Sequence, residues 1–151
     1  MKKKKVKIVG VIGGSSCGRE VYETSRHLGS LLAKKGYMVV CGGLGGVMRG
    51  VCEGAYKAGG ITIGILPGKF SGEANPFIKI PIVTAMAHAR NAVIVRTADV
   101  LVAVDGKYGT LSEIGMALSI GKKVISLKTS WNIPGIIKVQ TAEEVVGEIE
   151  G

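Results

Sequence analysis

Short apolar runs alternate with segments of helical periodicity along almost the whole chain, and this alternation constrains the fold more than any other feature. Residues 6–12 are nearly all apolar, as expected of a strand buried on both faces of a parallel sheet. Residues 19–35 follow with Leu28 and Leu32 at core spacing, and Gly36 ends this helical segment. A strand followed at once by a helix is the first half of a βαβ unit.

The same pattern predicts the other elements. An exposed loop is expected at 69–76, and Pro81 places its strand at an edge of the sheet. Further strands are expected at 37–41, 61–66, 78–83, 100–104, 124–127 and 136–139, and further helices at 47–58, 85–97, 110–120 and 141–150. Such alternation predicts a Rossmann-like three-layer αβα sandwich, with a central parallel sheet of about six to seven strands. We expect residues 1–151 to form a single nucleotide-binding domain, since no composition break divides them.

Glycine clusters stand where three of the predicted strands end. They are Gly13-Gly14-Ser15-Ser16-Cys17-Gly18, Gly42-Gly43-Leu44-Gly45-Gly46 and Gly106-Lys107-Tyr108-Gly109-Thr110. Each leads into a helix N-terminus, where free amides and the helix dipole suit a phosphate group. Because the carboxyl ends of parallel strands share one edge of the sheet, we expect one anion site there. The candidate ligand- and phosphate-binding residues are Gly13, Gly14, Ser15, Ser16, Gly42, Gly43, Gly45, Gly46, Met48, Lys107, Tyr108, Gly109 and Thr110.

Two common nucleotide-binding signatures are absent from these turns. The first turn is not a G-x-G-x-x-G fingerprint, no acidic residue ends the strand at 37–41, and no G-K-[ST] sequence is present. A nicotinamide-dependent dehydrogenase and a P-loop ATPase are therefore disfavoured.

The charge balance favours an anionic ligand. The chain has 20 basic and 11 acidic residues, a net charge of +9, and part of the excess lies in the run Met1–Lys5, which we interpret as a solvated tail. Aromatic residues are only 5% of the chain and scattered, which argues against base stacking and nucleic-acid binding. No apolar stretch approaches the roughly 18 residues of a membrane span, and a lysine run followed by a predicted strand lacks the apolar region of a signal peptide, so we expect neither. We expect a cytoplasmic protein without a membrane partner.

The three cysteines show no metal-type spacing, so we expect no metal site. Cys17, Cys41 and Cys52 are interpreted as small buried hydrophobic residues. Cys17 and Cys41 lie at strand-to-helix turns, so a ligand contact remains open for both.

Two blocks of sequence resemble the LOG-like (SLOG) Rossmann superfamily. The first is Cys41-Gly-Gly-Leu-Gly-Gly-Val-Met-Arg-Gly-Val51, followed by Ala58-Gly-Gly60 and Gly64-Ile-Leu-Pro67. The second is Ala87-His-Ala-Arg-Asn91 with Asp105-Gly-Lys-Tyr-Gly-Thr-Leu-Ser-Glu113, which is similar to the family motifs M-H-x-R-K and P-G-G-x-G-T-x-x-E. The family includes cytokinin-activating phosphoribohydrolases, proteins mislabelled as lysine decarboxylases, molybdenum-cofactor carriers and the DNA-processing DprA domain.

The resemblance implies catalytic roles for Arg90 and Glu113 if the protein is a phosphoribohydrolase, since the motif arginine and glutamate act there on the glycosidic bond. This sequence departs from that pattern. Asp105-Gly106-Lys107 replaces Pro-Gly-Gly, Ala87 replaces the methionine, and Asn91 replaces the lysine. These changes look more like the carrier branch of the family than the hydrolase branch.

Simpler interpretations of the same residues stay open. Thr110-Leu-Ser-Glu113 is also a capping-box pattern, and Arg90 is compatible with a solvated helix position. A lone histidine such as His88 is more often a helix-face residue than a base. Arg49 and Glu53, at i,i+4, are expected to form a surface pair.

The functional expectation is a small-ligand-binding protein of the LOG-like superfamily, of the molybdenum-cofactor carrier type. Its ligand would be a nucleotide or a molybdopterin-type cofactor, and no cofactor is required. The alternatives are a nucleoside 5′-monophosphate phosphoribohydrolase and DprA-like DNA binding. Lysine decarboxylation is disfavoured, because nothing marks a pyridoxal-phosphate lysine. The resemblance also implies a homodimer or tetramer.

Overall fold

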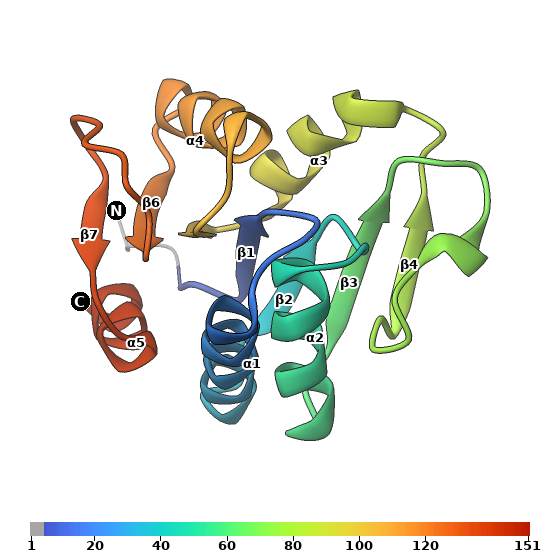
Figure 1. Ribbon diagram of the computed structural model, residues 1–151, viewed down its shortest axis with the longest axis horizontal. Coiled ribbons are helices and arrows are strands. Elements are labelled where there is room, and N and C mark those ends of the chain that lie inside the picture. Colours follow the sequence, from blue (N-terminus) through green and yellow to red (C-terminus); the bar gives the residue numbers. More distant parts are fainter. Residues whose placement is uncertain (1–4) are drawn as a thin grey trace.

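A seven-stranded parallel sheet is the frame of the molecule. The computed structural model describes residues 5–151, with the strands in the order β4-β3-β2-β1-β5-β6-β7 (Figure 1). Of the tail predicted for Met1–Lys5, all but Lys5 lies outside the described residues. The strands are β1 (Ile8–Gly13), β2 (Met38–Cys41), β3 (Thr62–Leu66), β4 (Ile80–Val83), β5 (Val100–Val104), β6 (Lys123–Leu127) and β7 (Ile137–Val139). As Pro81 predicted, β4 is an edge strand.

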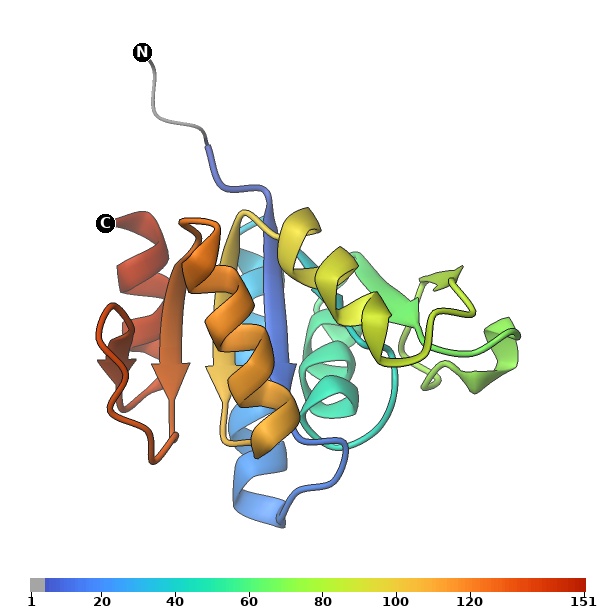
Figure 2. The same ribbon diagram turned by 90° about the horizontal axis from the view of Figure 1, so that it is seen from above.

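Helices cover both faces of this sheet. They are α1 (Arg19–Lys34), α2 (Val47–Lys57), α3 (Arg90–Thr97), α4 (Tyr108–Ser119) and α5 (Ala142–Glu150), with short 3-10 turns η1 (Ser71–Glu73) and η2 (Ala87–Ala89). The ribbon views place α1, α2 and α5 on one face and α3 and α4 on the other (Figure 2). Two buried clusters correspond to these layers, one with Leu28 of α1 and Val145 of α5, the other with Ile94 of α3 and Ile114 of α4. The predicted three-layer αβα sandwich is confirmed.

The direction in which the sheet grows reverses at β1. From β1 the chain adds β2, β3 and β4 on one side, and then returns to place β5 against the other side of β1. The helix that follows β1 and the helix that follows β5 lie on opposite faces, so the two connections diverge (Figure 1). In an open α/β sheet such a switch point leaves a crevice at the carboxyl ends of the strands.

The segment before α3 differs from the sequence prediction. A helix was expected from residue 85, but Ala85 and Ala87 have φ of 54° and 50°, and α3 begins only at Arg90. The backbone N–H groups of Ala85 and Ala87 donate to carbonyl groups of the loop after β3, at 2.8 and 2.9 Å. These tertiary hydrogen bonds override the helix propensity of alanine. The loop expected at 69–76 contains the short turn η1.

Helices α1 and α2 are in very close contact where they pack together, and glycines make this contact possible. A Cβ atom on Gly54 would overlap the carbonyl oxygen of Arg26, and one on Gly29 would overlap that of Val51. A Cβ on Gly50 would lie 3.0 Å from another backbone oxygen of α1. Part of the high glycine content therefore serves helix packing.

A threonine side chain caps the start of α5. The Thr141 hydroxyl accepts a hydrogen bond from the backbone N–H of Glu144 at 3.1 Å. This bond satisfies one of the free amides at the helix N-terminus.

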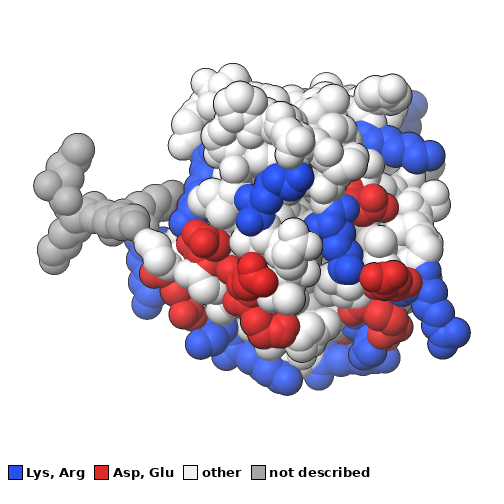
Figure 3. All heavy atoms as spheres, turned by 60° about the vertical axis from the view of Figure 1, so that its left-hand side comes forward, with Lys and Arg blue, Asp and Glu red and all other residues white. Residues whose placement is uncertain are grey.

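Acidic and basic side chains are mixed on the side of the molecule that carries β7 and α5, which Figure 3 turns forward. The ion pairs of the chain include Lys128–Glu20 at 2.9 Å and Lys35–Glu150 at 3.2 Å. The net positive charge is therefore not gathered on this side. Among residues 5–151, no helix is long and apolar enough to cross a membrane.

Candidate functional site

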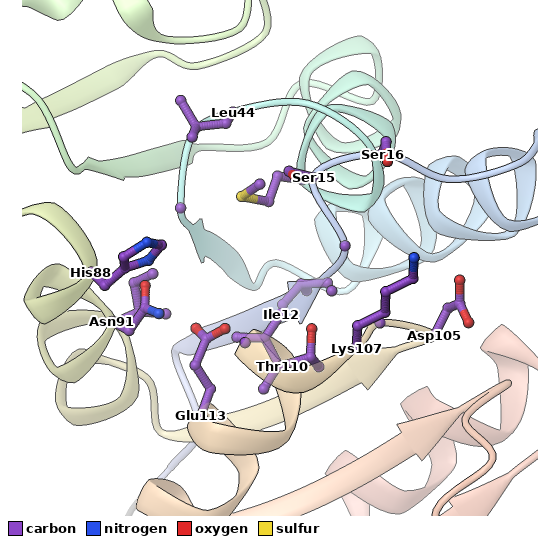
Figure 4. Close-up of a pocket in the computed structure, with 18 of the residues that line it drawn as sticks. Ile12, Ser15, Ser16, Leu44, His88, Asn91, Asp105, Lys107, Thr110 and Glu113 are labelled. Atoms are coloured by element: carbon purple, nitrogen blue, oxygen red, sulfur yellow. The ribbon is translucent and has the colours of Figure 1, made fainter.

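A cavity of about 370 Å³ lies at the switch point of the sheet, beyond the carboxyl ends of β1 and β5. Its walls come from the turn after β1, the turn after β5, the start of α4, and the segment η2–α3 (Figure 4). The predicted site residues that line it are Gly13, Gly14, Ser15, Ser16, Gly42, Met48, Arg90, Lys107, Gly109, Thr110 and Glu113. Gly13 and Glu113, which are 100 positions apart in the sequence, thus line one site.

Four predicted residues do not line this cavity: Gly43, Gly45, Gly46 and Tyr108. A Cβ on Gly43 would meet Leu66 of β3, and one on Gly46 would overlap the carbonyl oxygen of Gly14. These two positions of the second glycine turn therefore pack against β3 and against the first glycine turn, and do not line the cavity. Tyr108, the first residue of α4, is 86% exposed.

The cavity also has lining residues outside the set predicted from the sequence. Gly106, His88, Asn91 and Asp105 line the cavity, and apolar side chains complete its wall. Gly106 belongs to the third glycine cluster and Asn91 follows the motif arginine, so both had a sequence signal. The apolar lining residues are Val11, Ile12, Leu44 and Ile94. Leu44 belongs to the second glycine cluster, whereas nothing in the sequence distinguishes Val11, Ile12 and Ile94 from ordinary core residues.

The turn between β5 and α4 leaves the start of α4 open toward the cavity. Asp105 and Gly106 have φ of 49° and 100°, and a Cβ on Gly106 would lie 2.6 Å from that of Thr110. The N-cap position, Lys107, makes no side-chain cap hydrogen bond, so no side chain caps the first amides of α4. Next to it, the position of a Cβ on Gly109 is open space. Figure 4 shows the Lys107 side chain reaching toward the turn at Ser15 and Ser16.

The capping-box interpretation of Thr110 and Glu113 is wrong. Because α4 begins at Tyr108, Thr110 lies inside its first turn, and Glu113 lies one turn further along. Both side chains are buried, with 3% and 7% exposure. Glu113 is therefore a lining residue of the cavity.

Arg90 is a buried cation at the first position of α3. Its exposure is 8%, its Nη1 donates to Asn91 Oδ1, and its Nη2 donates to the carbonyl oxygen of Gly42 at 3.5 Å. Its Nε has no hydrogen-bond partner among the described residues. Burial lowers the pKa of Arg90, against an opposing effect of Glu113. A cation at a helix N-terminus is also opposed by the helix dipole, so this position costs the fold stability.

Glu113 is the matching buried anion. Burial raises the pKa of Glu113 to about 7, against the opposing charge of Arg90. No ion pair within 4.0 Å joins Glu113 to any cation among residues 5–151, so Arg90 acts on it only at longer range. Two opposite charges that are buried in one cavity without pairing leave hydrogen-bonding capacity for a third group.

The cysteines lie outside the cavity lining. Cys41 and Cys52 are fully buried, with 3.5 Å between their sulfur atoms, and Gly43 N–H donates to the sulfur of Cys41. Cys17 is half-buried and also does not line the cavity. Among the described residues, no group of three or more His, Cys, Asp or Glu side chains is arranged to hold a metal ion.

The expected pair of Arg49 and Glu53 does not form. Glu53 pairs with Lys57 at 2.8 Å, and the guanidinium carbon of Arg49 lies 5.5 Å from the centre of the Phe77 ring. Phe77 also contacts Tyr56, with 6.0 Å between ring centres. Two aromatic residues that are distant in the sequence therefore meet basic residues, outside the lining of the cavity.

Comparison with known proteins identifies the family to which this sequence is similar. A sequence model of the SLOG cluster 4 family matches residues 6–149. An uncharacterized protein of Archaeoglobus fulgidus is 46% identical over 91% of both chains. A probable cytokinin riboside 5′-monophosphate phosphoribohydrolase of Oryza sativa is 35% identical over 70% of this chain, which spans about half (49%) of that relative's length.

Solved structures agree with this placement. The molybdenum cofactor binding protein of Rippkaea orientalis has a TM-score of 0.92, with 32% identity over 99% of this chain and 98% of its own. The molybdenum cofactor carrier protein of Chlamydomonas reinhardtii has a TM-score of 0.86, with 29% identity over 95% and 96% of the two chains. DNA processing protein A of Streptococcus pneumoniae, at 18% identity over 95% of this chain and 62% of its own, has a TM-score of 0.77 and shares the fold alone.

Proposed function

This chain belongs to the SLOG cluster 4 family, and on that premise we propose that it binds a small phosphorylated ligand in the cavity between β1 and β5. One observation carries the proposal. Arg90 and Glu113 are both more than nine-tenths buried in that cavity, do not pair with each other, and face a space bordered by two glycine turns. A protein gains no stability from such an arrangement unless a ligand completes it.

The two ends of the cavity suit different parts of a ligand. The turn at Ser15 and Ser16, the uncapped start of α4 and Lys107 together offer amide, hydroxyl and ammonium donors, which suit a phosphate group. The deeper end, with Arg90 and Glu113, offers one donor-rich and one acceptor-rich side chain. A nucleotide or a molybdopterin-type compound has a phosphate at one end and a polar ring at the other.

The relatives favour a carrier over an enzyme. Proteins that bind or carry the molybdenum cofactor match almost the whole chain, whereas the matches to the plant phosphoribohydrolases cover only about half of those relatives' length. The motif that resembles the hydrolases is also altered here, with Asp105 and Lys107 in place of proline and glycine. We therefore propose a carrier whose cargo is the phosphorylated ligand.

Native mass spectrometry and calorimetry test this function. Freshly purified protein should carry a bound compound with the mass of a phosphorylated nucleotide or pterin, and the emptied protein should bind GMP or AMP. Lys107→Ala should weaken nucleotide binding roughly tenfold, since a charged hydrogen bond is lost, and should weaken the binding of inorganic phosphate by a similar factor. Lys138→Ala, on β7 and away from the cavity, is the control. Absence of any bound compound, with no nucleotide binding at millimolar concentration, would reject the function.

A phosphoribohydrolase is the second candidate, and the juxtaposition of Arg90 and Glu113 favours it. A carboxyl group with a pKa of about 7 is suited to proton transfer near neutral pH. If the protein is this enzyme, it releases adenine from AMP, and Glu113→Gln lowers the rate about 100-fold or more. Chromatography of the reaction products measures the free base. Retained AMP binding with no adenine released over a day rules this candidate out.

We also infer a homodimer through the outer face of α4. Ser112, Gly115 and Ser119 are exposed there, and Glu113, the only charged residue of α4, points into the cavity instead. An uncharged helix face with small side chains allows two copies to pack closely about a two-fold axis. Light scattering should give twice the monomer mass, reduced to one monomer by Gly115→Glu. A monomeric unmodified chain at micromolar concentration would refute this.

A further inference from the structure

The deep end of the cavity has an asymmetric set of hydrogen-bonding groups. The Asn91 side-chain oxygen accepts one hydrogen bond from Arg90, which directs that oxygen toward the guanidinium and leaves the two amide N–H donors of Asn91 for another group. Arg90 has five N–H donors and no acceptor, and among residues 5–151 only its two Nη atoms have hydrogen-bond partners. Donors of Arg90 and Asn91 therefore predominate here, and they favour a hydrogen-bond acceptor on the ligand.

The Glu113 carboxylate requires hydrogen-bond donors on the ligand, not an acceptor. Its carboxylate has no hydrogen-bond partner among the described residues, and Figure 4 shows it directed into the cavity, near Asn91. An ionised carboxylate has two oxygen atoms side by side, which accept two parallel N–H bonds. A ligand that satisfies this end has two adjacent donors next to one acceptor.

The walls around these groups are apolar. Ile12 of β1 and Ile94 of α3 are almost fully buried, and Met48 is buried with its side chain on the lining. Aliphatic and thioether side chains contact the faces of a flat ring well, whereas they give a sugar hydroxyl nothing to bond. The deep end thus suits a planar ring whose polar edge meets Arg90 and Glu113.

We propose that Glu113 and Arg90 together select a 2-amino-4-oxopyrimidine edge, the ring edge that guanine and pterin share. Its ring N–H and exocyclic amino group donate to the Glu113 carboxylate, and its carbonyl oxygen accepts from Arg90. This inference rests on the proposed ligand-binding function and specifies which ring edge of the ligand the site recognises. Hypoxanthine lacks the amino donor, and adenine sets a ring acceptor against the carboxylate.

Calorimetric titration of the full chain at pH 8.5, with Glu113 ionised, tests the selectivity. GMP should bind roughly tenfold more tightly than IMP and at least tenfold more tightly than AMP, since each lost or reversed hydrogen bond costs about a factor of ten. Neopterin monophosphate, which has the same ring edge, should also bind more tightly than IMP and AMP. Whichever of neopterin monophosphate and GMP binds more tightly identifies the ring system, pterin or guanine, that the site prefers.

Matched variants separate the ring edge from the rest of the ligand. Glu113→Gln should weaken GMP roughly tenfold while changing AMP by less than about threefold, and Glu143→Gln, an exposed carboxylate on α5, should change neither. Thermal melting confirms that each variant is folded. Equal affinities for GMP, IMP and AMP, or equal weakening of all three by Glu113→Gln, would overturn the selectivity and assign Glu113 to the ribose. Binding of no nucleotide and no phosphate would overturn the proposed function, and this selectivity with it.

Discussion

Gly54→Ala is expected to destabilise the protein by about 3 kcal/mol, the upper range for inserting one methyl group into a packed interior. The new Cβ would overlap the carbonyl oxygen of Arg26 and lie 2.9 Å from the amide nitrogen of Ser30. Both are backbone atoms of α1, so a change of side-chain rotamer cannot relieve the overlap. The helices must separate, and the buried contacts between α1 and α2 are lost with the close approach.

Urea unfolding of Gly54→Ala beside Gly147→Ala measures this effect. Gly147 lies in α5 with open space around the position of its Cβ. Alanine there should stabilise the protein by about 0.5–1 kcal/mol, because it lowers the conformational entropy of the unfolded chain. A Gly54→Ala protein within about 1 kcal/mol of the unmodified chain would show that α1 and α2 are not held at this distance.

Glu113→Gln is expected to stabilise the protein at pH 8.5 by an amount on the order of 3 kcal/mol, and not at pH 4.5. Burial raises the pKa of Glu113 from 4.5 in the unfolded chain to about 7 in the folded one, and Arg90 opposes the shift. The folded state therefore holds more protons than the unfolded state between these values. The stability of the unmodified chain falls as pH rises from about 4.5 to about 7, and the neutral glutamine does not share this loss.

Unfolding free energies at several pH values compare the two proteins. The other titratable or charged side chains on this cavity, Arg90, His88, Asp105 and Lys107, are present in both, so the difference isolates Glu113. Glu143→Gln gives a control of opposite sign, because hydrogen bonding to His27 lowers the pKa of Glu143. A constant difference between the Glu113→Gln and unmodified chains from pH 4.5 to 8.5 would mean that the Glu113 carboxyl is not desolvated by folding.

These two substitutions change stability in opposite directions for one reason. Close packing at Gly54 holds the scaffold together, whereas the buried charge at Glu113 weakens it. A protein retains a destabilising side chain where that side chain has a task, and here the side chain lines the cavity. The stability lost at Glu113 is consistent with a ligand-binding role.

The layers of the fold followed from periodicity. Runs such as Val100–Val104 are too short and too apolar for a surface helix, and their alternation with helical segments implied a parallel sheet. The start of α3 could not be predicted, because Ala85 and Ala87 are held by hydrogen bonds to a loop that is distant in the sequence. Local propensity has no information about such bonds.

The glycine turns of the candidate site could be predicted from the sequence, whereas the apolar residues at its deep end could not. Gly13, Gly14 and Gly109 follow the rule that phosphate meets backbone at the carboxyl ends of strands, and all three line the cavity. Sequence patterns could not separate these glycines from Gly43 and Gly46, which do not line the cavity. A glycine that close packing requires has the same sequence signal as a glycine that contacts a ligand. The role of Gly54 in helix packing was missed for the same reason.

A crystal structure of the protein with GMP tests the central claim most directly. We expect the phosphate to lie within hydrogen-bond distance of the turn at Ser15 and of the start of α4, with the guanine ring against Ile12 and its edge at Glu113. Density for the nucleotide at any other surface, or side chains of this chain filling the space between Ser15 and Thr110, would contradict it.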